Sequence, residues 1–471
     1  MIKTWPSRLA RRFRGVFAFV FGGVLLTIGI GGVAAQQPNI VVIMADDLGW
    51  KDLSIQGNET LDTPHLDKLA REGIRFTNGY AAAPVCSPTR AAMMTGLHPA
   101  RLGITNHAPG HQEGFRPKNR RVGEAKSLTY LGLQYETIAE RLKEAGYATS
   151  FLGKWHLSHR RRGEKGASEE DLRPEHQGFD MNVGGLDYGG PPSYFDPYRN
   201  VTIPSKKEGE YLSDRMAEEA IRFIKARQGK PFFVNWWNYS VHYPFQAPEV
   251  LIKKYEARKA AGANIKNPTY AAMIEAMDSS IGKLLDFLAT SGLAAETFVV
   301  FTSDNGPFAA DVRPLRGEKG YLYEGGIRVP WIIRWPGRIE SGKVVDDIVV
   351  STDLYPTLLE LAGLEPEYAL DGESLLPLLT EARSLKRSQL FFHYPNYAFH
   401  KKNELGAAVR EGDYKLIYRF EDARVELYNL EKDIGEQFNL SSTYPQLSNR
   451  LKTNLVTWLM EVGANLPMNE E

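Results

Sequence analysis

The residues most suggestive of chemistry surround the only cysteine of the 471-residue chain, in the stretch Cys86-Ser87-Pro88-Thr89-Arg90-Ala91-Ala92-Met93-Met94-Thr95-Gly96. Good helix formers follow Pro88, so Cys86 is expected near the N-terminus of a helix, where free backbone N–H groups and the helix dipole favour a bound anion. Arg90, one turn further, could return toward Cys86 and offer its planar guanidinium to an oxyanion. The simpler alternative is a buried free cysteine that packs as a small hydrophobic side chain.

Polar side chains follow two apolar segments that are rich in β-branched residues. Residues 39–44 precede Asp46 and Asp47, and residues 297–303 precede Asp304 and Asn305. Such runs are typical of buried parallel strands, and ligands bind at the carboxyl ends of these strands in α/β sheets. Carboxylate and amide oxygens suit calcium or magnesium rather than zinc. Either group alone could also be a solvated turn.

Two longer motifs resemble the type I sulfatases, which are formylglycine-dependent, arylsulfatase-like members of the alkaline phosphatase superfamily. Cys-x-Pro-x-Arg followed by Ala-Ala-x-x-Thr-Gly resembles their first signature, and Gly-Tyr-Ala-Thr-Ser-Phe-Leu-Gly-Lys-Trp-His-Leu at residues 146–157 resembles the second. The likeness covers nearly the whole chain after residue 35. Thr89 is a mild departure, because many members carry Ser there. The resemblance implies that Cys86 is oxidised after synthesis to formylglycine, an aldehyde that works as its hydrate.

The resemblance also implies a set of site residues. The implied metal ligands, for Ca²⁺ in preference to Mg²⁺, are Asp46, Asp47, Asp304, Asn305 and the formylglycine made from Cys86. The implied catalytic residues are Cys86, Arg90, Lys154, His156, His242 and Lys319. Lys154 and His156 are two residues apart, so in an extended segment they would share one face. A lone loop histidine such as His242 is more often structural, but its place after a strand and its match to a family site histidine favour the site.

The mechanism that the resemblance implies is nucleophilic catalysis of sulfate ester hydrolysis. One hydroxyl of the hydrate would attack sulfur, and the second would later expel sulfate. The cation, Lys154 and Lys319 would hold the charge on the nonbridging oxygens, while Arg90 would fix the hydrate. His242 or Lys319 would protonate the leaving oxygen, and His156 would take the proton of the second hydroxyl.

Other functions and several substrates stay open at this point. A hydrolase of phosphate or phosphonate esters from the same superfamily would share the metal geometry, and an exported carbohydrate-binding protein would keep an unconverted cysteine. Among sulfated sugars, polysaccharides, steroids and lipids, we predict a sulfated carbohydrate. The basic segments 111–121 and 160–162 could steer a sulfated polysaccharide, although a solvated basic face is the simpler explanation. His393 and Asn396 could reach the pocket, but an ordinary packed loop is favoured.

The first 35 residues predict export. Five basic residues flank or precede an apolar run over residues 16–30, and small residues at 33–35 offer a cleavage site. We therefore predict a signal peptide over 1–35 and a periplasmic or secreted protein, the alternative being an uncleaved anchor. Its removal changes the formal charge from 0 to −5, which argues against a nucleic-acid partner. The expected partners are the sulfated substrate and a formylglycine-generating or other sulfatase-maturating enzyme, with no stable membrane anchor.

The remaining pattern predicts an α/β fold. We expect a large mixed, mostly parallel sheet flanked by helices over residues 36–380, and a smaller C-terminal α+β domain with an antiparallel sheet over 381–471. The expected helices span 64–73, 135–145, 212–226, 355–361 and 444–462, and apolar residues at helical spacing from Tyr270 to Leu288 predict a core helix. Further expected strands span 147–152, 231–238, 331–335, 344–351, 390–394, 407–410, 414–420 and 425–430. Arg316 and Arg328 are expected to make scaffold ion pairs.

Overall fold

The computed structural model describes residues 37–110, 122–160, 167–227, 229–397 and 403–469. The predicted signal peptide, the basic segment 111–121, and Arg161 and Arg162 lie outside the described residues. In the part of the chain that the structure describes, no helix combines the length and the apolar composition that a membrane crossing requires.

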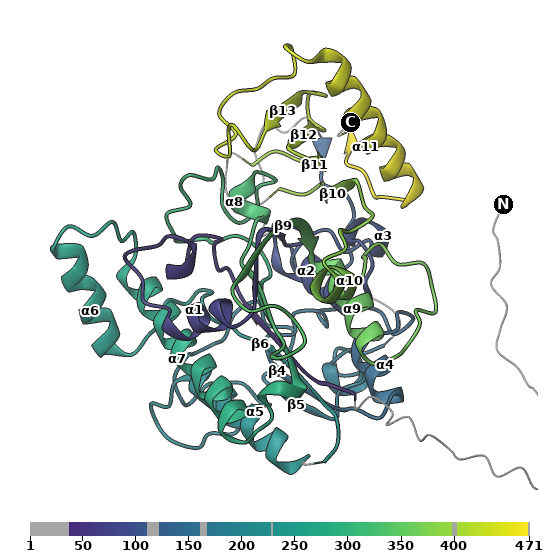
Figure 1. The fold of residues 1–471 in the computed structure, drawn as a ribbon. Coiled ribbons are helices and arrows are strands. Elements are labelled where there is room, and N and C mark those ends of the chain that lie inside the picture. Colours follow the sequence, from purple (N-terminus) through teal and green to yellow (C-terminus); the bar gives the residue numbers. More distant parts are fainter. Residues whose placement is uncertain (1–36, 111–121, 161–166, 228, 398–402, 470–471) are drawn as a thin grey trace, which may run out of the picture. The chain divides into compact units, whose positions relative to one another are not determined.

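Eight strands form one large mixed sheet (Figure 1). Their order across the sheet is β5-β4-β6-β1-β7-β8-β2-β9, and all are parallel except β8, which is antiparallel to β7 and β2. The strands are β1 (Asn39–Ala45), β2 (Ile74–Tyr80), β4 (Ala148–Gly153), β5 (Met181–Val183), β6 (Phe232–Trp237), β7 (Thr297–Ser303), β8 (Trp331–Arg334) and β9 (Lys343–Val350). The predicted mostly parallel sheet is therefore confirmed.

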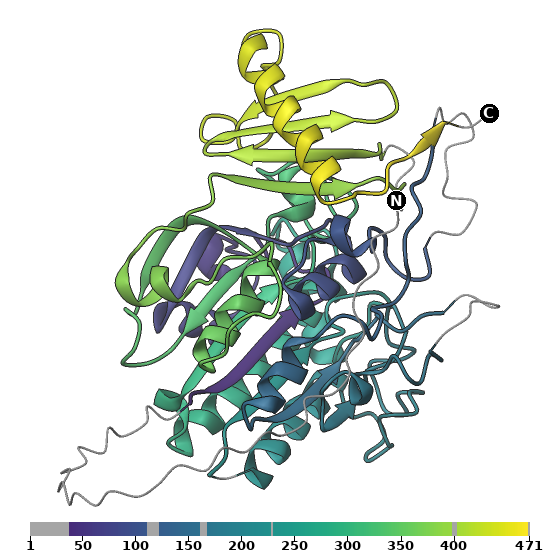
Figure 2. The same cartoon turned by 90° about the vertical axis from the view of Figure 1, so that its right-hand side faces the viewer.

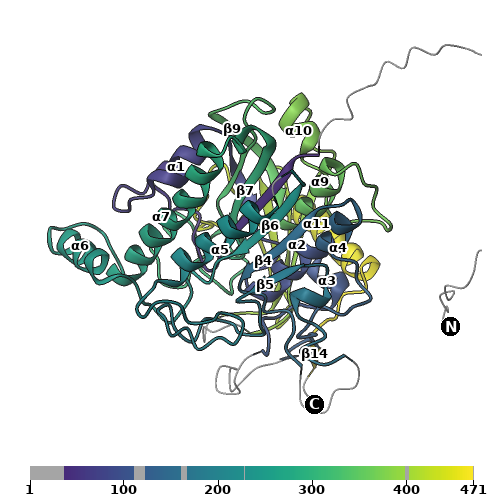
Figure 3. The same cartoon turned by 90° about the horizontal axis from the view of Figure 1, so that it is seen from below.

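Helices cover both faces of this sheet, as the view in Figure 3 shows. Side chains of β1 alternate between the two cores, with Val41 and Ile43 on one side and Ile40 and Val42 on the other. The first core is closed by α1 (Pro64–Arg71), α5 (Leu212–Ala226), α6 (Glu249–Ala260) and α7 (Pro268–Thr290). The second is closed by α2 (Cys86–Thr95), α3 (Pro99–Leu102), α4 (Ile138–Glu144), α9 (Leu354–Leu361) and α10 (Leu376–Glu381). Burial on both faces explains why the central strands read as continuous apolar runs.

The C-terminal part is an antiparallel sheet with one long helix, as predicted (Figure 2). Its strands, in spatial order, are β10 (Gln389–Tyr394), β11 (Gly406–Glu411), β12 (Tyr414–Arg419) and β13 (Val425–Asn429). The apolar stripe of α11 (Pro445–Glu461), with Leu451, Leu455 and Leu459, packs on Val409 and Leu416. A short pair, β3 (Val122–Gly123) with β14 (Met468–Asn469), joins two distant segments.

The observed helix ends follow local capping chemistry. The helix expected from residue 135 begins at Ile138, because the Thr137 hydroxyl accepts the Glu140 N–H and the Glu140 carboxylate accepts the Thr137 N–H. Helix α7 begins after Asn267, whose side chain accepts the N–H groups of Thr269 and Tyr270. This cap fixes the position of Tyr270 in the first turn.

Candidate active site

Four neighbouring strands, β4, β6, β1 and β7, end at the same edge of the sheet. The polar residues that follow them are, in sheet order, Lys154, His242, Asp46 with Asp47, and Asp304 with Asn305. The register pairs Ala45 with Ser303, so Asp46 and Asp304 leave adjacent strands side by side. The parallel topology thus gathers side chains that lie up to 259 positions apart in the chain, as expected for this edge of an α/β sheet.

Cys86 is the first residue of α2, as predicted. The Thr89 hydroxyl lies 3.2 Å from both the N–H and the carbonyl oxygen of Ala83, which fixes the loop between β2 and the helix. The Cys86 side chain is buried, with its Sγ 3.8 Å from Asp46 Oδ1. Burial raises the pKa of the thiol to about 12, so the unmodified side chain is a protonated thiol at neutral pH.

Three buried cations pair with the three aspartates. Lys154 Nζ lies 2.7 Å from Asp46 Oδ2, and Lys319 Nζ lies 2.6 Å from Asp47 Oδ1. The Nε and Nη2 atoms of Arg90 donate to Asp304 Oδ2 at 3.0 and 2.7 Å. Buried charges are tolerated when they are paired in this way.

The pKa values of the three carboxyl groups are shifted in different directions, upward for Asp46 and downward for Asp47 and Asp304. Burial, with the neighbouring carboxylates of Asp304 and Asp47, raises the pKa of Asp46 to about 8 against the opposing influence of Lys154 and Arg90. Burial also acts on Asp47, but Lys319, His242 and Lys154 outweigh it and hold that pKa below its ordinary value. Arg90 likewise outweighs burial and lowers the pKa of Asp304. Asp46 is thus the carboxylate whose charge is least well compensated by the protein.

The donor set at this edge fits a hard divalent cation. Ligand atoms of Asp46, Asp47, Cys86 and His242 lie within 4.8 Å of one another. Asn305 donates from Nδ2 to Asp47 Oδ1 at 2.7 Å, while its buried Oδ1 has no hydrogen-bond partner among the residues that the structure describes. An unsatisfied amide oxygen beside undercompensated carboxylates is the environment that calcium or magnesium prefers. These residues therefore form a metal-binding acidic cluster.

The two site histidines are both neutral but face differently. The predicted shared face of Lys154 and His156 requires an extended backbone. His156 instead has a left-handed backbone with φ of 60°, so that prediction does not hold. Its Nε2 lies 2.5 Å from the Ala108 carbonyl, whereas Nδ1 is buried and has no hydrogen-bond partner in the described part of the chain. His242 Nδ1 lies 2.7 Å from the Tyr243 carbonyl, and Nε2 lies 3.7 Å from Asp47 Oδ2. Burial, assisted by Lys154, lowers the pKa of His156, and burial with Lys319 and Lys154 lowers that of His242 to about 3.

Three arginines differ in part from the sequence prediction. Arg90 lies in the cluster, where three of its five guanidinium N–H groups donate to Asp304 and to the Lys154 carbonyl, the latter 2.5 Å from Nη1, and its role toward an oxyanion stays a prediction. Arg328 does form the expected ion pair, at 3.3 Å from Glu324. Arg316 instead stacks on the Tyr323 ring at 3.9 Å and donates to the carbonyl of Glu436. Arg316 is therefore a scaffold residue that forms no ion pair with any residue that the structure describes.

His393 and Asn396 are packed residues, as the favoured interpretation predicted. Nε2 of His393 contacts the Asn465 carbonyl at 2.9 Å. Asn396 accepts from the Thr105 hydroxyl and donates to the Ala125 carbonyl. Their hydrogen bonds connect chain segments near the C-terminal sheet.

The entrance to the cluster carries two aromatic residues that the sequence did not single out. A cavity of about 210 Å³ is lined by Asp47, His242, Tyr243, Phe308 and Lys319. Tyr243 is 66% exposed and Phe308 is 40% exposed. Tyr243 directly follows His242, and Phe308 lies three residues after Asn305. Their closeness to these motif residues is the signal that the sequence offers.

A buried network behind Asp47 was also missed. Asp52 follows Asp47 by five residues and belongs to no motif, while the helical spacing of Tyr270 predicts only a core residue. The Tyr270 hydroxyl lies 2.6 Å from Asp52 Oδ2 and 3.0 Å from the Asp47 carbonyl oxygen. A tyrosine on an apolar helix face requires a partner for its hydroxyl, which was the signal for this contact.

The fold and the site together define the class, an α/β protein with a buried cluster of paired acidic and basic side chains at the carboxyl edge of its sheet. The family model described as sulfatase matches residues 38–364, and the model described as N-sulphoglucosamine sulphohydrolase, C-terminal, matches residues 317–461. The chain belongs to the sulfatase family and is a sulfuric ester hydrolase.

Known proteins resemble the chain over most of its length. N-acetylgalactosamine-6-sulfatase of Sus scrofa is 34% identical over 427 residues, covering 83% of this chain and 74% of the relative. Arylsulfatase A of Homo sapiens is 32% identical over 478 residues, covering 88% and 86%. The crystal structure of Ps i-CgsB in complex with k-i-k-neocarrahexaose superposes with a TM-score of 0.74 at 29% identity, covering 90% of this chain and 93% of that chain.

Proposed function

We propose that this sulfatase removes sulfate from a sulfated carbohydrate, using a formylglycine hydrate made from Cys86 beside bound Ca²⁺. The observation that carries the proposal is the position of Cys86 at the start of α2, 3.8 Å from Asp46 and among Lys154, Lys319 and Arg90. Three carboxylates face three protein cations, so a divalent ion leaves the pocket with a positive balance that favours a sulfate monoester.

The residues of the chain would hold the reacting groups as follows. Oxygens of Asp46, Asp47, Asp304 and Asn305 would bind the cation, which supplies positive charge to the sulfate oxygens and acidifies the hydroxyl group next to it. A formylglycine hydrate at position 86 would supply one hydroxyl to attack sulfur as the alcohol leaves, and a second hydroxyl whose deprotonation would release sulfate and restore the aldehyde. Lys154 and Lys319 would hold the nonbridging oxygens.

His156 is suited to accept a proton. Its Nε2 faces the Ala108 carbonyl at 2.5 Å and must carry hydrogen, since a carbonyl cannot donate. The buried Nδ1 then carries the lone pair, and no described residue forms a hydrogen bond with it. Because burial and Lys154 lower its pKa, the ring is neutral and can take the proton of the second hydroxyl.

We assign protonation of the leaving oxygen to Lys319 rather than to His242. Nδ1 of His242 donates to the Tyr243 carbonyl, so Nε2 can donate only from an imidazolium, a form that burial together with Lys319 and Lys154 disfavours by lowering the pKa to about 3. Lys319 keeps its proton, because Asp47 and the neighbouring acidic groups raise its pKa against the effect of burial.

Lys319→Ala is expected to slow alkyl sulfate hydrolysis about 10²-fold more than aryl sulfate hydrolysis, because an alkoxide needs a proton to leave and a nitrophenolate does not. The measurement is kcat/KM for an alkyl sulfate and for para-nitrophenyl sulfate. His242→Ala is the matched control and should slow both esters equally. If the selective loss appeared in His242→Ala instead, the donor would be His242.

The entrance favours a substrate with a ring next to the sulfate. If Lys319 holds the sulfate, the alcohol part of the substrate lies in the entrance cavity between Tyr243 and Phe308. The volume of this cavity, about 210 Å³, is smaller than that of typical drug-sized pockets. Exposed aromatic faces suit the apolar C–H face of a sugar ring. The names of two similar proteins, N-acetylgalactosamine-6-sulfatase and the neocarrahexaose complex, also refer to carbohydrates.

The function is tested by turnover of a panel that contains para-nitrophenyl sulfate, para-nitrophenyl phosphate and defined sulfated monosaccharides. We expect hydrolysis of the sulfates, with at least one monosaccharide sulfate preferred over the aryl ester, and phosphate turnover lower by about 10³-fold. Faster phosphate hydrolysis would favour the related phosphate and phosphonate hydrolases. No turnover by protein with a converted Cys86 would favour a binding protein.

The aromatic entrance is checked on the same panel with Tyr243→Ala. The exposed ring contacts only the alcohol part in this proposal, so KM for the preferred sugar sulfate should rise about 10-fold while inhibition by inorganic sulfate stays unchanged. Val250→Ala, which removes another exposed apolar side chain, is the control. Equal KM values for the variant and the wild type would exclude Tyr243 from substrate binding.

The biological setting belongs to the same proposal. We infer that residues 1–35 direct export to the periplasm or outside the cell, and that a maturating enzyme oxidises Cys86. Residues 36–380 would form the catalytic domain and residues 381–471 the C-terminal domain.

A further inference from the structure

The backbone at Asp47 adopts a conformation that its sequence does not favour. Asp47 has φ of 61°, a left-handed value that residues other than glycine adopt infrequently. Its N–H donates to Asp304 Oδ1 at 3.2 Å and its carboxylate contacts Lys319 and Asn305. These contacts hold one side of the residue, so its carbonyl side needs a separate support.

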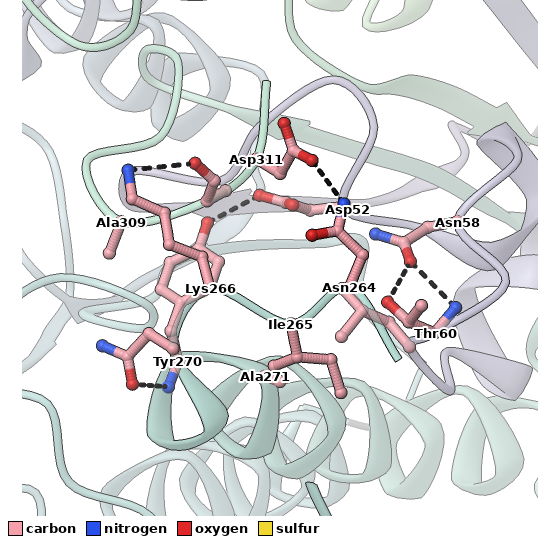
Figure 4. A pocket seen from close by; sticks show the side chains of 13 residues that line it. Asp52, Asn58, Thr60, Asn264, Ile265, Lys266, Tyr270, Ala271, Ala309 and Asp311 are labelled. Atoms are coloured by element: carbon pink, nitrogen blue, oxygen red, sulfur yellow. Dashed lines mark hydrogen bonds between the residues drawn. The ribbon is translucent and has the colours of Figure 1, made fainter. Parts of the chain in front are cut away.

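Tyr270 supplies this support from α7. Its side chain is buried, and its ring packs edge-on against Phe245 with the centroids 6.1 Å apart. The hydroxyl lies 3.0 Å from the Asp47 carbonyl oxygen and 2.6 Å from Asp52 Oδ2, and both are acceptors for its single proton. Figure 4 shows Tyr270 and Asp52 facing each other.

Asp52 holds the same backbone segment at a second point. Its Oδ2 accepts the Gly49 N–H at 2.7 Å, and its own N–H donates to the Gly49 carbonyl at 3.1 Å. A Cβ at Gly49 would lie 2.8 Å from Asp52 Oδ2 and 2.8 Å from Pro307, so the turn has no room for a side chain. Residues 47–49 are thus held at two points, by Tyr270 at the carbonyl of Asp47 and by Asp52 at the N–H of Gly49.

The pair lies behind the cluster and away from the substrate entrance. The cavity next to it, also lined by Asn264, Lys266 and Asp311, has a volume of about 40 Å³ (Figure 4). This is room for a few water molecules and not for a sugar ring. The entrance cavity is lined by Tyr243, Phe308 and Lys319 among others, and by neither Asp52 nor Tyr270.

We propose that Asp52 and Tyr270 are positioning residues of the metal site, which fix the strained backbone at Asp47 so that its carboxylate is directed at the cation. The inference rests on the metal site in the proposed function. Groups that orient ligands from behind typically change metal affinity 10- to 100-fold when they are removed. The sequence conceals this role, because Tyr270 follows the apolar spacing of its helix.

The test is calcium titration of metal-free, full-length protein by calorimetry. Tyr270→Phe keeps the ring against Phe245 and is expected to weaken Ca²⁺ binding about 10-fold, and Asp52→Ala about 10- to 100-fold. Asp52→Asn keeps an acceptor for the Gly49 N–H and should recover part of the loss. Because both side chains act on one segment, the double variant should lose less than the product of the single losses.

The matched control is Tyr255→Phe, which removes another buried hydroxyl, bonded to the Asp62 N–H at 3.1 Å. This variant should bind Ca²⁺ like the wild type, even where its melting temperature falls equally. Excess Ca²⁺ should restore kcat in Tyr270→Phe. If the wild type binds Ca²⁺ and the Ca²⁺ affinity is unchanged in Tyr270→Phe and Asp52→Ala, the positioning role is wrong while the proposed metal site stands. A wild type that binds no divalent cation would overturn the proposed metal site itself.

Discussion

Replacing Cys86 by alanine is expected to lower kcat for sulfate esters by on the order of 10⁴-fold or more, because the variant can form neither the aldehyde nor its hydrate. The fold should persist, since a small side chain at the start of α2 is lost and its Sγ makes only a long contact, 3.8 Å, with Asp46. The measurement is the initial rate with para-nitrophenyl sulfate, together with the melting temperature and calcium affinity of the variant.

The control for this experiment is Thr89→Ser, which keeps a hydroxyl within reach of the Ala83 backbone and should remain active. The mass of the tryptic peptide 76–90 reports conversion directly, because the aldehyde is lighter than the thiol. Cys86→Ala with most of the wild-type activity would refute the nucleophile. So would active, natively produced protein in which every copy of this peptide carries an unaltered thiol.

Much of the fold was predictable because its signals are local. The central strands are continuous apolar runs, as strands buried on both faces must be, and β1 and β7 follow these runs closely. Helix α5 coincides with the predicted span 212–226, since its apolar residues recur at helical spacing. The gathering of strand-end residues followed from the parallel topology alone.

The parts of the site that were not predictable depend on contacts between distant segments. Arg90 pairs with Asp304, 214 residues away, and nothing near Arg90 in the sequence indicates that partner. The left-handed backbone at His156 breaks the strand alternation that was used to orient Lys154 and His156. Tyr270 satisfies both the helical pattern and a polar contact, and only the pattern is visible in one sequence.

Removal of the cation is expected to produce the second large effect, a loss of activity of about 10²-fold or more. A bound cation would stabilise both the buried amide oxygen of Asn305 and the carboxylate of Asp46, whose negative charge the protein neutralises least. The measurement is kcat after chelation and desalting, and again after addition of Ca²⁺ or Mg²⁺. Ca²⁺ should restore activity more fully than Mg²⁺, because several carboxylate and amide oxygens suit the larger ion. Full activity in protein verified to be metal-free would contradict a metal role.

The pH dependence of calcium stabilisation gives this prediction a definite sign. In metal-free protein the pKa of Asp46 is about 8, above the ordinary value of 3.8, so between about pH 4 and about pH 8 the folded state binds more protons than the unfolded state. The contribution of Asp46 to stability therefore falls as the pH rises through this range. Asp47 and Asp304 have lowered pKa values, so their contributions are already complete above about pH 4.

Calcium binds the ionised carboxylate of Asp46 and offsets the stability that is lost when this group ionises. It should therefore raise the melting temperature more at about pH 8 than at about pH 5. Calcium-loaded and metal-free protein must be compared at each pH, because two other groups titrate in the same range. Burial raises the pKa values of Glu436 and Asp278 to about 7, and their effects on stability are the same in both forms and cancel in the comparison. A calcium-induced shift that is equal at the two pH values, or larger at the lower one, would show that Asp46 does not face the cation.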